Sequence, residues 1–127
     1  MTGVIWIIQG VHYPAFEYVD RAKFKAFHMF HSNRITWIVA PVMVLELTSA
    51  FALCFTRRGW FVWNLASVVA VWCVTFFVSV PLHNQLSAHF EGTFVKKLIG
   101  TNWLRTSIWT LRSFFLIWAL SWTHFRV

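Results

Sequence analysis

Charged residues are scarce in this chain of 127 residues, and acidic residues are the scarcest. They total 12%, with 4 acidic against 11 basic side chains, whereas hydrophobic residues make up 58% and aromatic residues 20%. A soluble domain of this size needs more polar surface than such a composition supplies, which excludes an ordinary soluble domain. The sequence therefore predicts an integral membrane protein that is all helical.

Other features are missing as well. The N-terminus lacks a basic stretch followed by a small-residue cleavage site, so we expect no cleavable signal peptide. No internal repeat, linker or low-complexity segment is present, which predicts one domain over residues 1–127. The two cysteines, Cys54 and Cys73, are expected at depths too different for a disulfide and are predicted to be small buried residues.

The net charge of +7 does not indicate a nucleic-acid partner. Lysine and arginine fall at the ends of apolar runs, where charges next to a membrane attract anionic lipid headgroups. We therefore expect the lipid bilayer as the main partner and no nucleic acid.

Long apolar runs are what the chain has in plenty. The cleanest, from Trp60 to Leu82, has 23 residues without a charge. At about 1.5 Å per residue it crosses a hydrocarbon core of about 30 Å. Pro81 is expected to mark its end, and the basic turn at residues 56–59 ends the helix before it. The sequence predicts a bundle of four transmembrane helices with short loops, at about residues 1–19, 27–55, 60–82 and 100–123.

The first of these helices is the least regular. Its thirteen residues before Pro14 cannot cross a membrane as a straight helix. Either the helix continues through Pro14 to Val19, or the true start lies upstream of Met1. Aromatic belts are expected at the two interfaces, one with Trp6, Trp60, Trp63 and Trp122 and the other with Tyr18 and Trp103.

Basic residues predict the orientation. We call face A the membrane surface that holds the loops 20–26 and 84–99, and face B the surface that holds the turn at 56–59 and both termini. Face A would lie in the cytoplasm by the positive-inside rule. The residues that decide this are Arg21, Lys23, Lys25, Lys96 and Lys97 at face A, against Arg57, Arg58 and Arg126 at face B.

Five of the six histidines are expected at face A, and only His124 at face B. Threading the helices up and down brings the ends of all four together there. The polar residues gathered at face A are His12, Tyr13, Glu17, His28, His31, Arg34, His83, Asn84, Gln85, His89, Asn102 and Arg105.

The histidine spacing suggests a ligand set. His28 and His31 are three residues apart and share a helix face, and Arg34 is expected to continue that stripe. Imidazole binds zinc, copper, iron or haem, and helix bundles draw such ligands from facing helices. Two readings stay open: a metal ion or haem is bound, or interfacial histidines merely occupy the headgroup region without a cofactor. The candidate metal ligands are His28, His31, His83 and His89.

Two ionisable residues lie deeper, Glu46 and Arg112. Because an isolated charge is costly in the hydrocarbon region, such side chains face the bundle interior or pair with one another. We expect a buried ion pair between Glu46 and Arg112 that joins the second and fourth helices and orders the bundle, without chemistry of its own.

Several segments resemble a known group of proteins. VSVPLHNQLS at residues 78–87 and TNWLRTSIWTLR at residues 101–112 are similar to the V-P-L-N-x-x-L and N-x-x-R-T patterns of small bacterial four-helix membrane proteins of unknown function related to the anthrone oxygenases. The matching residues are Pro81, Leu82, Leu86, Asn102, Arg105 and Thr106, and His83 stands where the pattern has asparagine. HYPAF at residues 12–16 and RITWIVAPVMVLEL at residues 34–47 also look similar.

The resemblance implies a four-helix bundle in a bacterial inner membrane. It also implies oxygen-dependent oxidation of an aromatic substrate without a dissociable cofactor. Since fold does not determine function, no catalytic residue is carried over from it.

Two functions follow as hypotheses. The preferred one is a redox or oxygenase-like protein that acts on a lipophilic aromatic or quinone-type molecule, with His28, His31 and His83 as catalytic acid–base groups. The alternative is a non-catalytic accessory or assembly subunit, in a homo-oligomer or a larger membrane complex. In the preferred hypothesis a substrate oxygen would be held by Tyr13, Asn102 and Arg105.

Overall fold

The computed structural model describes residues 1–57 and 59–124, with side chains through Ser121. Within these residues the regular structure is entirely helical and no strand occurs. Arg58 and Arg126, which the orientation prediction counted, lie outside the described residues, as do the side chains of Trp122 and His124. The elements are α1 (Thr2–Ile7), η1 (Ile8–His12), η2 (Pro14–Tyr18), α2 (Arg21–Arg57), α3 (Phe61–Val74), η3 (Thr75–Ser79), α4 (Val80–Ala88) and α5 (Gly92–His124).

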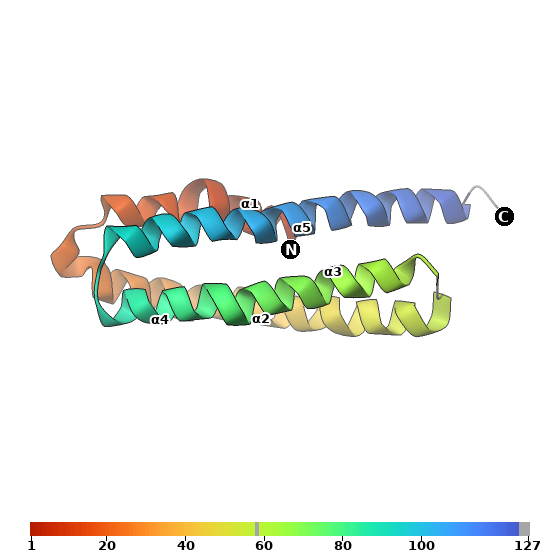
Figure 1. Ribbon diagram of the computed structural model, residues 1–127, viewed down its shortest axis with the longest axis horizontal. Helices are drawn as coiled ribbons and strands as arrows, with labels where there is room; N and C mark the ends of the chain where they lie inside the picture. The colour runs from red at the N-terminus through yellow and green to blue at the C-terminus, as the bar shows by residue number, and fades with distance from the viewer. Residues whose placement is uncertain (58, 125–127) are drawn as a thin grey trace.

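The elements form an elongated up-and-down bundle (Figure 1). α2, the run α3–η3–α4, and α5 extend along the long axis, and the N-terminal segment lies against α5. This segment covers only part of the length, so the N-terminus lies near the middle of the bundle, whereas α5 extends to one tip. The predicted all-helical fold is therefore confirmed, with one helix much shorter than the others.

The third helix does not end at Pro81, contrary to the prediction. α3, η3 and α4 form one continuous helix from Phe61 to Ala88. A proline inside a helix lacks the N–H donor and crowds the carbonyl four residues earlier, and the wider π turn of η3 immediately before it relieves that crowding. The helix ends where His89 adopts an extended backbone.

The second and fourth helices begin earlier than predicted. α2 starts at Arg21 instead of residue 27, and Asp20 caps it by accepting a hydrogen bond from the Ala22 N–H at 2.7 Å. α5 starts at Gly92 instead of residue 100. Both extra stretches are amphipathic, because Phe24 and Val95 are buried while the lysines around them are exposed.

The N-terminal segment is three short helices instead of one helix over residues 1–19. The π-helical η1 ends at His12, and Pro14 starts the 3₁₀ helix η2. Trp6 packs edge to face on Trp103, with ring centroids 5.6 Å apart. The prediction that these two tryptophans belong to opposite belts is therefore wrong, because α1 begins at mid-bundle.

Two helices are long and apolar enough to cross a membrane, α2 with 37 residues and Phe61–Ala88 with 28. Only 11% and 17% of their most apolar windows are buried inside the protein, so most of that apolar surface faces outward. α5 has 33 residues, but Arg105 and Arg112 in its middle lower its hydropathy. The bundle of four membrane spans thus stays a prediction.

The core lies mainly in the half of the bundle toward face A, where the N-terminal segment meets the three long helices. Phe16 and Phe24 pack there edge to face at 5.8 Å. Both cysteines are free, and Cys73 is exposed instead of buried as predicted, because it lies on the outer side of α3. The core cluster consists of Ile5, Ile8, Tyr13, Phe16, Phe24, Met43, Val71, Leu86, Val95, Leu98 and Trp109.

Candidate functional site

Three predicted site residues and one serine form a hydrogen-bonded chain near the face A end of the bundle. The Tyr13 hydroxyl lies 3.1 Å from His83 Nε2, and His83 Nδ1 lies 3.0 Å from His28 Nε2. The chain continues from His28 Nδ1 to Ser87 Oγ at 3.1 Å. It therefore links α4 to the N-terminal segment and to α2, across sequence separations of 55 to 70 residues.

One set of tautomers satisfies every atom of this chain. The Ser87 hydroxyl donates to the His83 carbonyl at 3.0 Å, the usual bond from a helical serine to the residue four before it. Ser87 must then accept from the His28 Nδ1–H, and His28 Nε2 from the His83 Nδ1–H. His83 Nε2 is left to accept from the Tyr13 hydroxyl. Both imidazoles are neutral in this arrangement.

Local structure explains why these side chains meet. His83 and Ser87 are four residues apart and share the face of α4 that packs on α2. His28 is fully buried, and its ring stacks on Phe24 one turn earlier at 5.6 Å. The break at Pro14 places Tyr13 at the junction of η1 and η2, with its ring inside the bundle.

Arg105 is the second feature of the site. Its guanidinium, only 4% exposed, donates to Ser79 Oγ at 3.2 Å and to Asn102 Oδ1 at 3.3 Å. It also interacts with Tyr13. In the described part of the chain no carboxylate pairs with Arg105, and its Nε has no hydrogen-bond partner. A buried cation without a counter-ion is costly, so this position favours an electron-rich oxygen.

Asn102 holds Arg105 from the N-terminal side. It donates to Gln9 Oε1 at 2.8 Å while its own oxygen accepts from the guanidinium. The guanidinium lies 5.3 Å above the ring of Trp109, which adds a cation–π contact. Asn102 is therefore a support for Arg105 and does not face the cavity described next.

A cavity of about 250 Å³ opens beside Tyr13, His83 and Arg105. We call it the seam cavity, because it lies in the seam between α2 and the helix α3–η3–α4. Its remaining walls are mainly apolar, apart from the hydroxyl groups of Thr36, Thr75 and Ser79. The indole Nε1 of Trp72, another lining residue, has no hydrogen-bond partner. Apolar cavities with a few convergent polar groups are the usual form of small-molecule sites. The lining residues are Ile8, Tyr13, Ile35, Thr36, Val39, Ala40, Met43, Val44, Trp72, Thr75, Phe76, Ser79, Val80, His83 and Arg105.

The π segments explain why a cavity exists here. α2 packs closely on α3 and on α4 but has at most slight contact with η3 between them. The wide turns of η3, needed before Pro81, thus leave the seam open at that level. η1, the other π segment, contributes Ile8 to the same cavity. Single π turns are frequent at functional sites.

His31 lies beside the hydrogen-bonded chain without joining it. It is 3% exposed, and neither ring nitrogen has a hydrogen-bond partner. Its ring stacks at a tilt on His12, with centroids 4.3 Å apart, and lies 6.1 Å from the His83 ring. The structure thus brings His31 near the site but gives it no bonded role.

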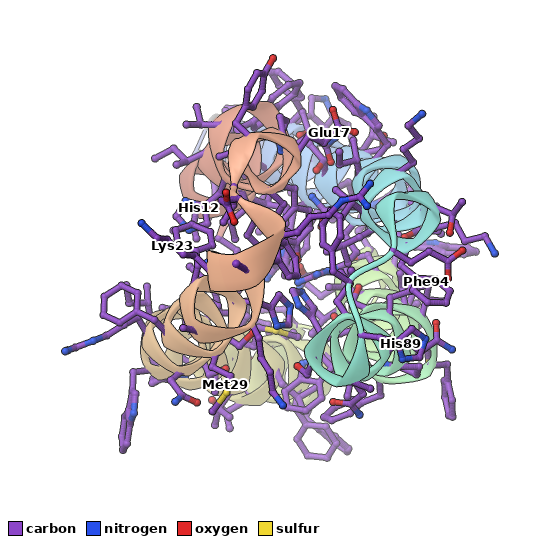
Figure 2. The ribbon with its side chains drawn as sticks, turned by 90° about the vertical axis from the view of Figure 1, so that its left-hand side faces the viewer. His12, Glu17, Lys23, Met29, His89 and Phe94 are labelled. Atoms are coloured by element: carbon purple, nitrogen blue, oxygen red, sulfur yellow. The ribbon has the colours of Figure 1, made fainter. Side chains whose placement is uncertain are left out.

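The predicted metal ligands do not converge on one point. Among the described residues no group of three or more histidine, cysteine or acidic side chains is arranged to hold a metal. His28 and His83 share a hydrogen bond, and His89 is exposed at the end of α4, where it packs on Phe94 at 6.0 Å. In Figure 2, which shows this end, His89 and His12 lie on different sides of the bundle.

Other polar residues expected at this end face outward. Arg34 is exposed over the ring of Phe30 at 5.4 Å, because the buried stripe of α2 continues at Ile35, four residues after His31. Glu17, Asn84 and Gln85 are also exposed.

The predicted ion pair is present in the structure. Arg112 Nη1 lies 3.0 Å from Glu46 Oε1, and the two side chains are 9% and 17% exposed. Trp109 donates to the other carboxylate oxygen at 2.8 Å, and Arg112 Nε donates to Asn64 Oδ1 at 2.8 Å. Since Trp109 also contacts Arg105, the pair is connected to the site through one indole.

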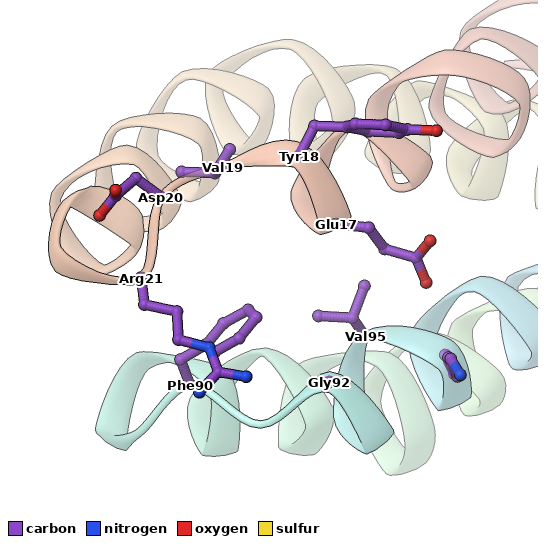
Figure 3. A pocket seen from close by; sticks show the side chains of 9 residues that line it. Glu17, Tyr18, Val19, Asp20, Arg21, Phe90, Gly92 and Val95 are labelled. Atoms are coloured by element: carbon purple, nitrogen blue, oxygen red, sulfur yellow. The ribbon is translucent and has the colours of Figure 1, made fainter.

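A larger hollow, of about 570 Å³, lies elsewhere, at the tip of face A. Figure 3 shows its charged wall, where Arg21 reaches over Phe90 at 5.7 Å. Glu17 and Asp20 line it as well, but no residue of the hydrogen-bonded chain does. We therefore place the candidate site at the seam cavity.

Sequence reasoning missed Ser87, Ser79 and Trp72. Ser87 had a usable signal, because it follows His83 by four residues and so lies on the same helix face. Trp72 had no such signal in the sequence. Its indole N–H lacks a partner because η3 stays apart from α2, and this spacing cannot be read from the sequence.

Comparison with known protein families, curated proteins and solved structures gave no match for this chain. The resemblance to relatives of the anthrone oxygenases therefore stays a hypothesis that rests on the quoted segments alone.

Proposed function

We propose that this protein is an integral membrane protein that binds a small lipophilic aromatic molecule, a phenol, quinol or quinone, in the seam cavity. His83 exchanges a proton with the bound molecule through the Tyr13 hydroxyl, and Arg105 holds the oxygen of that molecule. The reaction type that fits this arrangement is an oxidation with dioxygen as the electron acceptor.

The outward-facing apolar surface supports the membrane location. In water, α2 and Phe61–Ala88 would expose most of their apolar windows, which is unfavourable for a monomeric soluble protein. α5 would serve as a further span because its two arginines turn inward, Arg105 to Asn102 and Arg112 to Glu46. We place the protein in a bacterial inner membrane with face A in the cytoplasm, as its basic residues favour.

The observation that carries the proposal is a pair of buried, unpartnered donors on two residues that line one mainly apolar cavity. Arg105 Nε and Trp72 Nε1 both lack hydrogen-bond partners, and both residues line the seam cavity. Buried donors are nearly always satisfied in proteins, so an acceptor-bearing ligand would complete this site. Because the other walls are apolar, the ligand should be an aromatic ring with oxygen substituents.

The chemistry follows from the hydrogen-bonded chain. The Tyr13 hydroxyl occupies His83 Nε2, so the substrate hydroxyl gives its proton to the Tyr13 oxygen while the Tyr13 proton moves to His83 Nε2. Arg105, which lines the same cavity, stabilises the oxyanion that deprotonation leaves. With a quinol as substrate, two protons and two electrons leave the ring, which becomes the quinone. Dioxygen takes up both electrons and both protons and becomes hydrogen peroxide.

Ligand titration of the protein in lipid nanodiscs tests this proposal. We expect a simple quinone to quench tryptophan fluorescence saturably in the wild type. Arg105→Leu should abolish saturable quenching, and the matched Arg34→Leu, at an exposed position of α2, should leave it unchanged. Val39→Trp, which fills the cavity without altering a charge, should also abolish it while circular dichroism shows an intact helical fold.

Unchanged binding in both Arg105→Leu and Val39→Trp would refute the site. A wild-type protein that binds no such ring and co-purifies with a fixed partner would favour the accessory-subunit hypothesis instead.

A further inference from the structure

A second hollow adjoins the seam cavity on the side away from the histidines. It has a volume of about 370 Å³ and is open at the surface of the bundle, where Val69, Phe76 and Phe77 are 46%, 54% and 78% exposed. We call it the deep groove, because it lies farther from face A than the seam cavity. Its walls hold no charged or hydroxyl side chain. It is lined by Leu47, Val69, Trp72, Cys73, Phe76 and Phe77.

The deep groove and the seam cavity share a wall. Trp72 and Phe76 line both, and their rings lie 5.4 Å apart at a tilt of 33°. The unpartnered Trp72 Nε1 thus sits on a side chain that borders both spaces. If a ligand in the cavity is bound to Trp72, the edge of the ligand at Trp72 lies next to the groove.

A third hollow, of about 220 Å³, adjoins the cavity toward face A, and polar side chains make up a larger share of its lining than in the other two spaces. His83 lines both the cavity and this third hollow. Ser87 and Ser32, whose hydroxyl has no hydrogen-bond partner, line the third hollow but not the cavity. The three spaces therefore follow one seam, from polar at face A to apolar in the bundle's middle. From His83 to Val69 the helix advances about 20 Å, which is longer than any single aromatic ring.

We infer that the ligand of the seam cavity carries a long apolar tail, which lies in the deep groove while the ring lies at Arg105 and Trp72. This inference rests on the proposed function and names the substrate class, a quinone or phenol with a prenyl-type or alkyl chain. Continuity with the cavity favours the tail of the same molecule over a separate lipid chain, because Trp72 and Phe76 line both spaces and a chain attached to a ring at Trp72 passes directly from one space into the other.

Photo-crosslinking tests the inference directly. Two probes share one quinone ring and one alkyl chain and differ only in where a diazirine is attached, beside the ring or at the tail end. In nanodiscs, the ring-labelled probe should crosslink to residues 35–43 of α2, and the tail-labelled probe to residues 69–77 of α3 and η3. Excess unlabelled tailed quinone should suppress both crosslinks.

Groove variants provide the matched control. Val69→Trp should fill the deep groove and lower the affinity for the tailed quinone by at least about tenfold. Even one methylene group in an apolar pocket changes binding by about this factor. The same variant should leave the tailless quinone within about twofold of the wild-type affinity, since it does not touch the cavity. Ile117→Trp, on the exposed side of α5, should change neither ligand's affinity.

The outcomes separate the two proposals. Saturable binding of tailed and tailless quinones with equal affinity, and tail crosslinks that no competitor suppresses, would overturn the tail assignment and leave the cavity site standing. Absence of saturable binding for both quinones would overturn the proposed function itself.

Discussion

His83 is the residue on which the candidate site depends most. It bonds Tyr13 through one ring nitrogen and His28 through the other, so it joins three segments of the chain. No other natural side chain offers one donor and one acceptor on opposite edges of a ring of this size. The site thus depends on this residue for its geometry as well as for its proton.

Replacing His83 by leucine should destabilise the protein by about 1–3 kcal/mol, because the substitution leaves Tyr13 and His28 with unpaired polar atoms inside the bundle. The thermal unfolding midpoint in detergent measures the effect. His89→Leu is the matched control, since His89 is exposed and bonded to none of these groups. Equal midpoints for the two variants would contradict the hydrogen-bonded chain.

Arg112→Leu should destabilise the protein by about 1–3 kcal/mol, because it removes the guanidinium from the Glu46 carboxylate and leaves only the Met1 ammonium, 3.5 Å away, as its cation. Glu46→Gln should partly rescue the variant, since an amide keeps the acceptor for Trp109 and removes the charge. Thermal unfolding of the two single variants and the double variant forms the required cycle. Wild-type stability in both single variants would show that the pair is not structural.

At this scale the sequence predicted some partners and missed others. The meeting of Tyr13, His28 and His83 followed from up-and-down threading of helices that begin or end at face A. The threading did not predict that the His89 side chain is exposed, because its exposure results from α4 ending at Ala88, one residue earlier. His31 shares a face with His28 as predicted, but which nitrogen finds a partner is decided by side-chain packing that spacing does not encode.

Among the elements, η3 has the greatest influence on the site. Its wide turns keep α2 away from the third helix at the level of the seam cavity. Helix boundaries are the weakest part of the sequence prediction, because hydropathy does not reveal such local changes in helix geometry. The sequence predicts a helix end at Pro81, because a π turn that accommodates a proline leaves no sign in hydropathy. It predicts loops at the starts of α2 and α5, because exposed lysines interrupt the apolar pattern there.

Pro81→Ala should weaken quinone binding without lowering thermal stability. Alanine restores a backbone donor and removes the crowding that the π turn relieves, so the helix can return to regular α geometry and narrow the cavity. Pro41→Ala, in the middle of α2 and outside the cavity lining, is the control and should leave binding unchanged. Fluorescence titration and thermal unfolding are measured on both variants. Wild-type quinone binding by Pro81→Ala would contradict the explanation that the π turn of η3 before Pro81 creates the cavity.

The whole molecule is a bundle of unequal helices. The N-terminal segment covers α5 only toward face A, and the polar side chains are concentrated in that same half. Composition predicted the helical fold well because periodic apolar runs dominate the chain. It could not predict the short first element, since a broken helix and a straight one have the same hydropathy.

Cysteine labelling tests the membrane topology. In a Cys54→Ala, Cys73→Ala background, a cysteine placed at Thr93 reports on face A and one at Trp60 reports on face B, as both positions are exposed. A membrane-impermeant maleimide added to intact bacterial cells opened at the outer membrane should label Trp60→Cys and leave Thr93→Cys unmodified. The reverse pattern would invert the orientation, and labelling of both would contradict a protein that spans the membrane with these ends on opposite sides.

In a protein that spans the membrane as proposed, the hydrogen-bonded chain from His83 to Ser87 has an electrical consequence. It spans one helical turn, about 5 Å of a hydrocarbon core of about 30 Å, so a proton that passes along it crosses about a sixth of the membrane field. A full crossing is worth about 2.3 kcal/mol per 100 mV, which makes this step worth about 0.4 kcal/mol. That is close to a twofold bias in proton position, enough for an energised membrane to modulate the reaction in the cavity and too little to drive it.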